Sequence, residues 1–397
     1  MNQPMRVLHI LNGLGFGGAE TWLLEIMKQN QGKVQFDFLL TGGVERELDS
    51  FFKDQGCNLY YVRYSSKGIF GFIKGLNKVV KEGNYDAVHN HEDFSAGFHW
   101  LFLLFRLPRV RISHAHNSMI YINNYANTFG RKCFYKLGKF LNGLLATKLT
   151  GTSLKLMTEL GYDTLYYTHK RIECLYCGSE PSRFQFDPLI RKEYRSQLGF
   201  SESDKVVIFI GRIGLNRDNE INHKNPEFAF EISQKLTQRD PSFRFLFVGE
   251  KDRLGNAMEK QVEEMGLKDN IIFLGKRKDV HHLLKAADLL LFTSTLEPFG
   301  LVLVEAQFCS LPLVASNILT NEAVVFPELF RLLDVSKKDT EEWVGAIEQL
   351  MNKTYDRNEF AKAHQYDIEN SAFSIKNSYL RLIKHYSTPS FKGIKFN

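Results

Sequence analysis

Cysteines and long apolar runs are scarce in this 397-residue chain. Five cysteines do not make a disulfide framework at this length, so the composition predicts a reduced protein of the cytoplasm. No stretch reaches the roughly 18 apolar residues of a spanning helix. The longest candidate, Trp100 to Phe105, stops at Arg106. The first residues also lack the apolar core and the small-residue cleavage site of a signal peptide. These absences favour a cytoplasmic protein over an integral membrane one.

Charge of one sign is also in short supply. The 51 basic and 45 acidic residues leave a net charge of only +6, which excludes the concentrated positive charge typical of a nucleic-acid binder. A hydrophobic share of 44% with 24% charged residues is that of a soluble globular chain and excludes a disordered one. The small basic excess fits an anionic small molecule or an anionic membrane surface equally well.

Short apolar runs alternate with helical stretches along the chain. In the first half, the predicted strands and helices cover residues 7–11, 19–29, 36–40, 45–53, 59–62, 70–81, 85–88, 94–105 and 110–113. In the second half, they cover residues 205–211, 226–237, 244–249, 256–265, 270–275, 280–286, 289–293, 302–308 and 313–316. This alternation predicts an α/β fold with parallel sheets. We therefore expect two Rossmann-like, doubly wound domains facing a cleft.

The segment between these two halves divides the chain. Residues 179–199 carry prolines and mixed charges, and we interpret them as an interdomain connection. The N-terminal domain is then predicted over residues 1–178 and the C-terminal domain over residues 200–372. Folds of this class bind ligands at the carboxyl ends of their parallel strands, so the motifs at those ends are the candidates for function.

A glycine-rich turn opens the N-terminal domain. Gly13, Gly15 and Gly18 match the spacing G-x-G-x-x-G between a strand and a helix, with Gly17 and Glu20 beside them. Glycine permits positive φ and close backbone approach, and a helix N-terminus favours an anion. A nicotinamide enzyme needs an acidic residue at the end of the second strand, where this chain has none. The turn is thus an anion site, a dinucleotide site or a tight turn without a ligand.

Two motifs in the C-terminal domain combine cations with a helix start. Arg212 follows one predicted strand and Lys224 precedes a helix that starts with proline, so both can offer positive charge to a phosphate. The segment 297–305 reads E-P-F-G-L-V-L-V-E and is the strongest signal in the chain. The amides of Gly300 and Leu301 would lie at a helix N-terminus, where a diphosphate is favoured.

Both acids of that segment can reach one ligand. Glu297 lies in the predicted loop and Glu305 lies one to two turns into the predicted helix. The neighbours of Glu305 in the sequence are apolar, so its carboxylate needs a hydrogen-bond partner such as a ribose hydroxyl. The alternative is that Glu305 is an acid of the helix's N-terminal half, stabilised by the macrodipole.

Together these motifs resemble the retaining glycosyltransferases of family four, which have the GT-B fold. The glycine-rich turn, the pair Arg212 and Lys224, and the segment 297–305 occur in the family's order over most of the chain. The segment 110–117 is similar to one in bacterial cell-surface polysaccharide transferases. The resemblance implies a nucleotide-diphosphate-sugar donor on the C-terminal domain, UDP-sugar by default, and a glycan or lipid-linked acceptor on the N-terminal one. It also implies that the last helix, about residues 373–386, packs back on the N-terminal domain.

Carried over residue by residue, the resemblance implies specific roles. Arg212 and Lys224 bind the donor diphosphate. Glu305 binds the ribose and Glu297 meets the donor sugar. His116 is the N-domain histidine near the reacting sugar, with His114 as the alternative. The implied catalytic residues are Glu297, His116, Arg212 and Lys224. The other implied contacts are Phe299, Gly300, Leu301, Lys276 and Arg277 for the donor, and the N-domain glycine loop of Gly15, Gly17, Gly18 and Glu20.

The resemblance therefore predicts a hexosyltransferase of cell-surface polysaccharide biosynthesis that retains the anomeric configuration. The chain has no Asp-x-Asp pair, the motif that holds a metal ion on the donor in the other common transferase fold. We thus expect a site without metal or other cofactor, in which cations and helix amides face the phosphates. The alternatives are a sugar-nucleotide epimerase on the same fold and, resting on the N-terminal glycines, an NAD-dependent oxidoreductase.

A basic stretch in the N-terminal domain offers a route to the acceptor. Residues 129–148 mix apolar side chains with five cations: Arg131, Lys132, Lys136, Lys139 and Lys148. As a helix, this stretch can lie on an anionic surface, which predicts peripheral contact with the inner face of the plasma membrane. The alternative is an ordinary domain helix with a solvated basic face.

Overall fold

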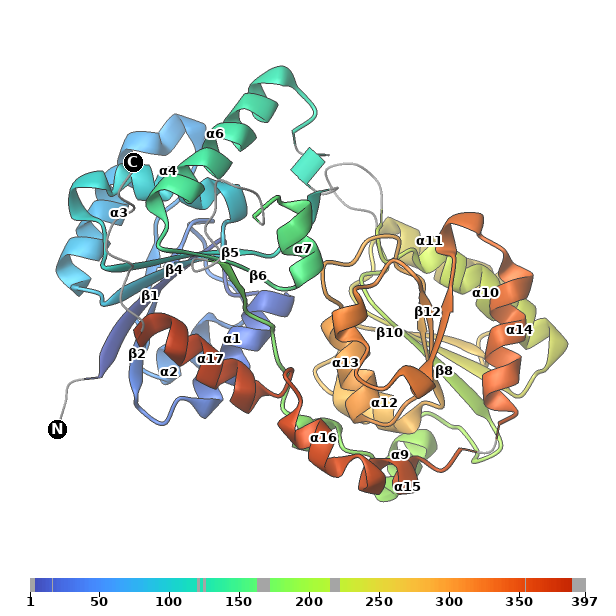
Figure 1. Ribbon diagram of the computed structural model, residues 1–397. Helices are drawn as coiled ribbons and strands as arrows, with labels where there is room; N and C mark the ends of the chain where they lie inside the picture. Colours follow the sequence, from blue (N-terminus) through green and yellow to red (C-terminus); the bar gives the residue numbers. More distant parts are fainter. Residues whose placement is uncertain are drawn as a thin grey trace. The chain divides into compact units, whose positions relative to one another are not determined.

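A computed structural model describes residues 4–15, 17–119, 122–123, 126–162, 172–214, 222–353 and 355–387 (Figure 1). The chain divides into two compact units. Unit 1 comprises Met1–Ser179 and Ala372–Asn397, and unit 2 comprises Glu180–Ser371. Each unit is an α/β domain built on one parallel sheet, which is the fold class predicted from the sequence.

Unit 1 has a seven-stranded sheet in the order β3-β2-β1-β4-β5-β6-β7. The strands are β1 (Met5–Leu11), β2 (Val34–Leu40), β3 (Leu59–Tyr61), β4 (Ala87–Asn90), β5 (Val110–Ala115), β6 (Lys148–Gly151) and β7 (Ile172–Cys174). The chain runs outward from β1 to β3 and then returns to place β4 on the other side of β1. That reversal between β1 and β4 is the point at which doubly wound sheets bind ligands.

Within the described residues, helices connect the parallel strands of unit 1, and one more helix lies at its C-terminal end. They are α1 (Gly18–Gln29), α2 (Asp49–Asp54), α3 (Ile69–Gly83), α4 (Ala96–Phe102), α6 (Phe129–Leu145), α7 (Leu154–Glu159) and α17 (Ile375–Ser387). The strands β6 and β7 have only four and three residues. The alternation of strands and helices in the sequence did not predict these two strands.

The C-terminal helix α17 is part of unit 1, although it lies at the far end of the sequence (Figure 1). The indole of Trp22 on α1 donates to the hydroxyl of Ser378 at 2.8 Å, and that hydroxyl donates to the Tyr176 carbonyl at 2.8 Å. Gly178 lets the end of the first segment of unit 1 approach the start of the second, because a Cβ there would lie 2.8 Å from the Phe373 carbonyl oxygen. These contacts fix the helix against α1.

Unit 2 has a six-stranded sheet in the order β10-β9-β8-β11-β12-β13. The strands are β8 (Lys205–Ile210), β9 (Phe243–Val248), β10 (Ile271–Gly275), β11 (Leu289–Phe292), β12 (Leu313–Ser316) and β13 (Phe330–Leu333). The helices are α8 (Pro181–Phe184), α9 (Pro188–Gln197), α10 (Pro226–Arg239), α11 (Arg253–Glu264), α12 (Val280–Ala286), α13 (Leu301–Phe308), α14 (Thr340–Met351), α15 (Arg357–Ala363) and α16 (Gln365–Asn370). The switch point lies between β8 and β11.

Residues 180–199 belong to unit 2 instead of forming the predicted connection. They contain α8 and α9, and α9 is tied to the start of β11 by two arginines. Arg191 donates to Asp288 at 2.6 Å, and the buried Arg195 donates to the same carboxylate at 3.1 Å. The mixed charges that suggested a linker are therefore internal ion pairs of the second domain.

A second buried guanidinium holds the helix ends of unit 2 together. Arg357 is 8% exposed and donates to four backbone carbonyls, those of Leu284, Lys285, Ala287 and Cys309. These carbonyls lie at the C-terminal ends of α12 and α13, where the last carbonyls have no hydrogen-bond donor within the helix. The guanidinium also lies 4.1 Å from the centre of the Phe186 ring.

The predicted basic stretch becomes helix α6 followed by strand β6. Gly138 of α6 lies against α4, because a Cβ at Gly97 would come within 2.1 Å of its carbonyl oxygen. The prediction of five helical cations is wrong in one respect. Lys148 belongs to β6 and is buried, and burial lowers the pKa of its ammonium. Four cations remain on the helix, among four exposed apolar side chains: Phe129, Leu137, Phe140 and Leu144.

Candidate functional site

Lys224 is held at the carboxyl end of the unit 2 sheet by hydrogen bonds to the end of β11. Thr293, the first residue after that strand, donates from Oγ1 to the carbonyls of Lys224 at 3.1 Å and Asn225 at 3.0 Å. The amide of Thr295 donates to the His223 carbonyl at 2.8 Å. Asn225 has a φ of 54° and precedes α10. The turn before the helix is therefore pinned to a buried strand.

The Lys224 ammonium and the Glu297 carboxylate form an ion pair. The lysine side chain is 32% exposed and the glutamate side chain 12% exposed, so solvent reaches the cation. The lysine Nζ also lies 5.5 Å from the centre of the Phe292 ring. Gly211 at the end of β8 makes room for the lysine stem, since a Cβ there would lie 3.0 Å from its Cγ. The structure thus brings together two predicted site residues that are 73 positions apart.

The start of α13 lies against the same glutamate. Gly300 precedes the helix with a φ of 87°, a conformation that favours glycine. A Cβ at this position would also lie 3.2 Å from the Glu297 Cγ and 2.8 Å from Leu303. Leu301 is the first helical residue, so its amide is among those without a partner inside the helix. Glu305 lies half-buried in the second turn of α13.

The other predicted donor residues lie around this centre. Phe299 is buried in the loop before α13. Arg212 is exposed directly after β8, and its carbonyl accepts from the Asn222 side chain at 2.7 Å. Part of the loop between Arg212 and Lys224, residues 215–221, falls outside the described residues.

Lys276 and Arg277 are exposed after β10. Arg277 makes two hydrogen bonds to Asp279, at 2.8 and 2.6 Å. This pairing lowers the pKa of the Asp279 carboxyl to about 2. The guanidinium of Arg277, an implied donor contact, is thus paired with an acid of its own loop.

The glycine loop of unit 1 does not have the backbone that we expected. Gly13, Gly15, Gly17 and Gly18 all lie outside the positive-φ region. A Cβ at Gly17 would lie 2.2 Å from a carboxylate oxygen of Glu20, the end of a flexible side chain. Burial raises the pKa of that carboxyl. The chain's own acid therefore lies at the helix start, the place that an anionic ligand would take in two of the three interpretations of this turn.

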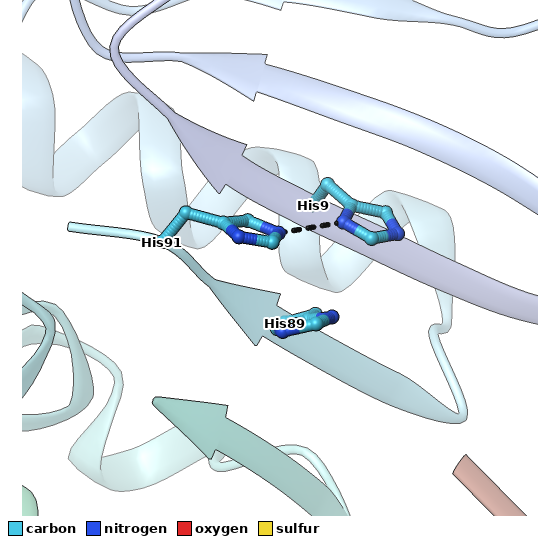
Figure 2. A group of neighbouring side chains, drawn as sticks. All are labelled: His9, His89 and His91. Atoms are coloured by element: carbon cyan, nitrogen blue, oxygen red, sulfur yellow. Dashed lines mark hydrogen bonds between the residues drawn. The ribbon is translucent and has the colours of Figure 1, made fainter. Parts of the chain in front are cut away.

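Five histidines and one tyrosine form a hydrogen-bonded chain at the switch point of unit 1. We call this group the histidine chain. Figure 2 shows three of its members, with the bond between His9 and His91 dashed. Its links are, in order, His116 Nε2 to His91 Nδ1 (2.9 Å), His91 Nε2 to His9 Nδ1 (2.9 Å), His9 Nε2 to Tyr386 Oη (3.2 Å), Tyr386 Oη to His89 Nδ1 (3.0 Å) and His89 Nε2 to His114 Nδ1 (3.2 Å).

Strand register and the C-terminal helix assemble this chain. His9 on β1 and His89 on β4 are direct partners in the parallel ladder. His91 and His116 follow the carboxyl ends of β4 and β5, and Tyr386 comes from α17. All members are buried except His116, which is half-buried. The His116 end of the histidine chain therefore reaches the surface at the carboxyl edge of the sheet.

Burial keeps the imidazoles neutral. It lowers the pKa of His9 to about 3 and that of His116 to about 4. Burial and the neighbouring rings hold the pKa values of His89, His91 and His114 well below the usual value of an imidazole. Neutral imidazoles at pH 7 can donate one hydrogen bond and accept one, which suits uncharged hydroxyl groups.

Two trios within the histidine chain have nitrogens close enough for a metal ion. They are His9, His89 and His91, and His91, His114 and His116, each with its nitrogens within 4.8 Å of one another. The His9 and His91 nitrogens face each other at 2.9 Å, so the lone pair of one meets the proton of the other (Figure 2). A metal ion would have to break that bond, so the geometry favours hydrogen bonding over ligation.

Asp93 positions His116, the outer end of the histidine chain. Its φ of 45° turns the backbone after β4. Its carboxylate accepts from the amides of His116 at 2.8 Å and Asn117 at 3.2 Å, and from the Asn117 side chain at 2.6 Å. The sequence motifs did not indicate five residues of this group: Asp93, His9, His89, His91 and Tyr386. The repeated spacing His-x-His at 89–91 and 114–116 was the available signal, because alternate residues share one face of a strand.

Sequence comparisons identify relatives of known class. Residues 190–366 match the family described as glycosyl transferases group 1. EpsF of Bacillus subtilis, whose name assigns it provisionally to the glycosyltransferases, is 27% identical over 385 residues, 94% of this chain and 96% of EpsF. The capsular polysaccharide biosynthesis glycosyltransferase CapH of Staphylococcus aureus is 25% identical, covering 95% and 99%. An Escherichia coli UDP-Gal:alpha-D-GlcNAc-diphosphoundecaprenol alpha-1,3-galactosyltransferase is 25% identical, covering 78% and 76%.

Solved structures agree on the fold. HepE of Anabaena, solved in complex with UDP and glucose, matches with a TM-score of 0.76 at 19% identity, covering 97% of this chain and all of HepE. WaaG, a glycosyltransferase involved in lipopolysaccharide biosynthesis, matches with a TM-score of 0.69 at 16% identity, covering 95% and 99%. Both support the predicted architecture of two Rossmann-like domains.

Proposed function

We propose that this chain, whose residues 190–366 match the group 1 glycosyl transferases, moves a hexose from a UDP-sugar to a glycan or lipid-linked acceptor with retention of configuration. The observation that carries the donor assignment is the meeting of Lys224, Glu297 and Gly300 at the carboxyl edge of the unit 2 sheet. A cation and a helix N-terminus at one sheet edge suit a diphosphate. HepE, which shares the fold, was solved with UDP and with UDP-glucose.

The acceptor class is supported by the names of the relatives. CapH is named for capsular polysaccharide biosynthesis, and the Escherichia coli relative is named for a diphosphoundecaprenol-linked sugar. We therefore propose a role in cell-surface polysaccharide biosynthesis with a growing glycan or a lipid-linked sugar as acceptor. The enzyme would act in the cytoplasm, where nucleotide sugars are the donors.

The proposed mechanism stabilises the leaving diphosphate. Negative charge grows on it as the glycosidic bond breaks. The Lys224 ammonium, the Arg212 guanidinium and the amides of Gly300 and Leu301 would meet that charge, each fixed donor contributing about 3 kcal/mol. No metal ion is needed, because these groups supply the positive charge. Glu305 would accept hydrogen bonds from the ribose.

We assign Glu297 to hydroxyls of the donor sugar and His116 to the reacting sugar. We propose that the acceptor attacks from the face that the diphosphate leaves, and that a phosphate oxygen takes the acceptor proton. This route retains the anomeric configuration.

Product analysis tests the proposal. The purified chain is incubated with UDP-glucose, UDP-galactose and their N-acetyl forms, with and without a diphosphate-linked lipid acceptor, and NMR determines the anomer formed. We expect acceptor-dependent UDP release and a product with the donor's anomeric configuration. An inverted product contradicts retention. Interconversion of UDP-sugars without acceptor supports the epimerase, and a spectral change of NAD with substrate supports the oxidoreductase.

We further propose that α6 brings unit 1 to an anionic membrane. Within the described residues, none of the helices combines the length and apolarity needed to cross a bilayer. The four cations of α6 flank exposed apolar side chains, and each cation near an anionic surface contributes about 1 kcal/mol before screening. The protein should therefore co-sediment with anionic vesicles at low salt and be released at high salt, because screening shortens the range of the attraction.

A charge-matched control makes this membrane test specific. Replacing Lys132, Lys136 and Lys139 by Glu should abolish sedimentation and leave nucleotide binding intact. The same change at three exposed lysines of unit 2 should leave sedimentation nearly unchanged: Lys260, Lys268 and Lys353. Equal loss in both triple variants would show a nonspecific charge effect and would contradict a docking role for α6.

A further inference from the structure

The ion pair of Lys224 and Glu297 adds no net charge to the carboxyl edge of the unit 2 sheet. Both partners are held by residues outside the pair. The Lys224 carbonyl accepts from the Thr293 hydroxyl at 3.1 Å, and the Glu297 stem lies so close to Gly300 that a Cβ there would be 3.2 Å from the Glu297 Cγ. An anion that binds to this lysine therefore also meets the carboxylate.

The carboxylate is the more buried partner of this pair, so solvent screens it less than it screens the ammonium. The ammonium has three protons, and those that do not face Glu297 can be donated to a phosphate. A diphosphate that accepts from Lys224 would then have the Glu297 carboxylate as its neighbour. Two negative charges a few ångströms apart repel each other strongly where water is scarce.

Free UDP and a UDP-sugar differ in how they meet this carboxylate. A terminal phosphate has a second pKa of about 6, so free UDP carries about one negative charge more at pH 7 than a UDP-sugar, in which that oxygen is bonded to the sugar. The sugar also has hydroxyl groups that can donate to the carboxylate, and hydrogen bonds to a charged acceptor are the stronger ones. The repulsion is therefore offset for the intact donor and remains in full for the free diphosphate.

From this geometry we infer that Glu297 makes the donor site prefer an intact nucleotide sugar to the free nucleoside diphosphate. The inference rests on the proposed function in one respect, because it takes Lys224 to face the diphosphate. After transfer, the diphosphate has lost the sugar hydroxyls and gained negative charge, so the carboxylate favours its release. Glu297 is then a specificity-determining residue that limits inhibition by the product, in addition to its contact with the sugar.

Calorimetric titration of the full chain tests this role without any turnover. The probes are UDP, inorganic diphosphate and whichever of the four UDP-sugars named above binds the parent most tightly. Glu297→Gln keeps the length of the side chain and removes its charge, so UDP and diphosphate should bind about tenfold more tightly, which corresponds to about 1.4 kcal/mol of removed repulsion. The UDP-sugar should gain at most about twofold, because it also loses its charged hydrogen-bond acceptor. Weaker UDP binding, or equal gains for UDP and the UDP-sugar, overturns the inference.

Two further variants separate the charge of Glu297 from its other contributions. Glu263→Gln breaks an exposed pair with Lys268 in the same unit and changes the net charge by the same amount, so UDP affinity should match that of the parent. Glu297→Asp keeps the carboxylate and should stay within about threefold of the parent. A tenfold gain in either variant overturns the inference. If circular dichroism shows that Glu297→Gln does not fold, Glu297→Ala removes the same charge and has the same expected result.

The outcomes distinguish this inference from the proposed function. If the parent binds UDP but transfers no sugar, the proposed function fails, and a tenfold gain of UDP affinity in Glu297→Gln still supports the inference. If neither UDP nor a UDP-sugar binds to the parent or the variant, the UDP donor fails, and inorganic diphosphate alone decides. Tighter binding of diphosphate to Glu297→Gln then supports the repulsion by Glu297, whereas unchanged or undetectable binding overturns it.

Discussion

The two units carry opposite chemistry at the same edge of the same kind of sheet. In unit 1, the strand ends at the switch point hold neutral imidazoles that bond to one another. In unit 2, they hold an ion pair, Lys224 with Glu297, beside a helix N-terminus. A neutral hydrogen-bonding edge suits sugar hydroxyls and a charged edge suits a diphosphate. The topology provides the position, and a few side chains at the strand ends decide what can bind there.

The buried ionisable side chains of the two units also differ, neutral in one and charged in the other. Unit 1 buries histidines that are neutral at pH 7, whereas unit 2 buries the permanent charges of Arg195 and Arg357. Those guanidiniums are matched by Asp288 and by backbone carbonyls. Because imidazoles titrate near neutral pH and guanidiniums do not, the two units should respond differently to acid and to substitution.

The largest expected effect is acid destabilisation of unit 1. Burial lowers the pKa of seven of its described histidines: His9, His89, His91, His99, His114, His116 and His385. As pH falls below the unfolded value of about 6.5, the unfolded chain binds protons first, so the stability present above pH 6.5 is lost as pH falls from about 6.5 toward 3. Each histidine contributes about 1.4 kcal/mol per pH unit in that range.

Three acids of unit 1 oppose this trend. The pKa of Glu92 is raised to about 7, and those of Glu20 and Asp93 are also raised, mainly by burial. These groups bind protons first in the folded state, so they add stability as pH falls. Seven histidines against three acids leave a net loss. Unit 2 should lose less, with three described histidines of lowered pKa: His223, His281 and His282.

Tryptophan fluorescence can follow the units separately. Trp343 is the tryptophan of unit 2, and Trp22 and Trp100 are those of unit 1. Urea titrations of Trp343→Phe report unit 1, and those of the Trp22→Phe, Trp100→Phe double variant report unit 2. We expect the midpoint for unit 1 to fall more between pH 7 and pH 5. Equal shifts in the two variants would contradict the contrast between the units.

The next largest effect is expected from Arg357→Ala in unit 2. The change removes one guanidinium and leaves the buried carbonyls of α12 and α13 without their donor. Hydrogen bonds from a charged group contribute about 1.5–3 kcal/mol each, so unit 2 should lose about 3 kcal/mol or more of its unfolding free energy. Arg239→Ala, which breaks a pair with Glu341 that is exposed on both sides, should cost at most about 1 kcal/mol. Similar urea midpoints for the two variants would refute the role of Arg357.

Lys224→Ala removes the cation from the charged edge of the unit 2 sheet. We expect kcat/KM for the donor to fall about 10²-fold, because the leaving diphosphate loses a fixed cation. Lys235→Ala, on the exposed face of the same helix α10, should leave the rate unchanged. Steady-state kinetics with both variants measure the difference. Full activity in Lys224→Ala would remove the diphosphate assignment.

Glu305→Ala should have a similar or smaller effect on donor binding. Loss of a charged acceptor for the ribose costs about 1.5–3 kcal/mol. Calorimetric titration with UDP measures this loss directly, and the ion pair of Lys224 with Glu297 is untouched by the change. UDP affinity equal to that of the parent would show that Glu305 is a structural acid of α13.

Most of the fold follows from the sequence because the spacing of apolar residues differs between strands and helices. The helix over 280–286 is found where predicted, and most other long elements differ by one to three residues at their ends. The motif order also placed Lys224 and Glu297 at one edge, although 73 residues separate them. Local pattern and strand order are sufficient for such a pair.

The histidine chain could not be predicted in this way. Its links join residues up to 377 positions apart, and the tyrosine that completes it comes from the other end of the protein. A single sequence contains no signal for that contact. The glycine loop shows the opposite failure, since a motif was present but the Glu20 carboxylate lies against Gly17. Side chains of neighbouring elements, not the motif itself, decide what the turn can bind.

The smallest expected effect is that of metal removal, which sharpens the comparison between the two edges. The proposed donor site uses the Lys224 ammonium and the first amides of α13 for positive charge, so transfer should be unchanged by EDTA. The two histidine trios are the groups among the described residues with metal-binding spacing, and hydrogen bonds already occupy nitrogens in both. Activity is measured before and after chelation, and again with added magnesium, manganese or zinc. Loss of transfer that only magnesium or manganese restores would move the diphosphate to a metal site and away from Lys224. Loss that only zinc restores would mean that the imidazoles of unit 1 are ligands, and the contrast between a neutral and a charged edge would no longer hold.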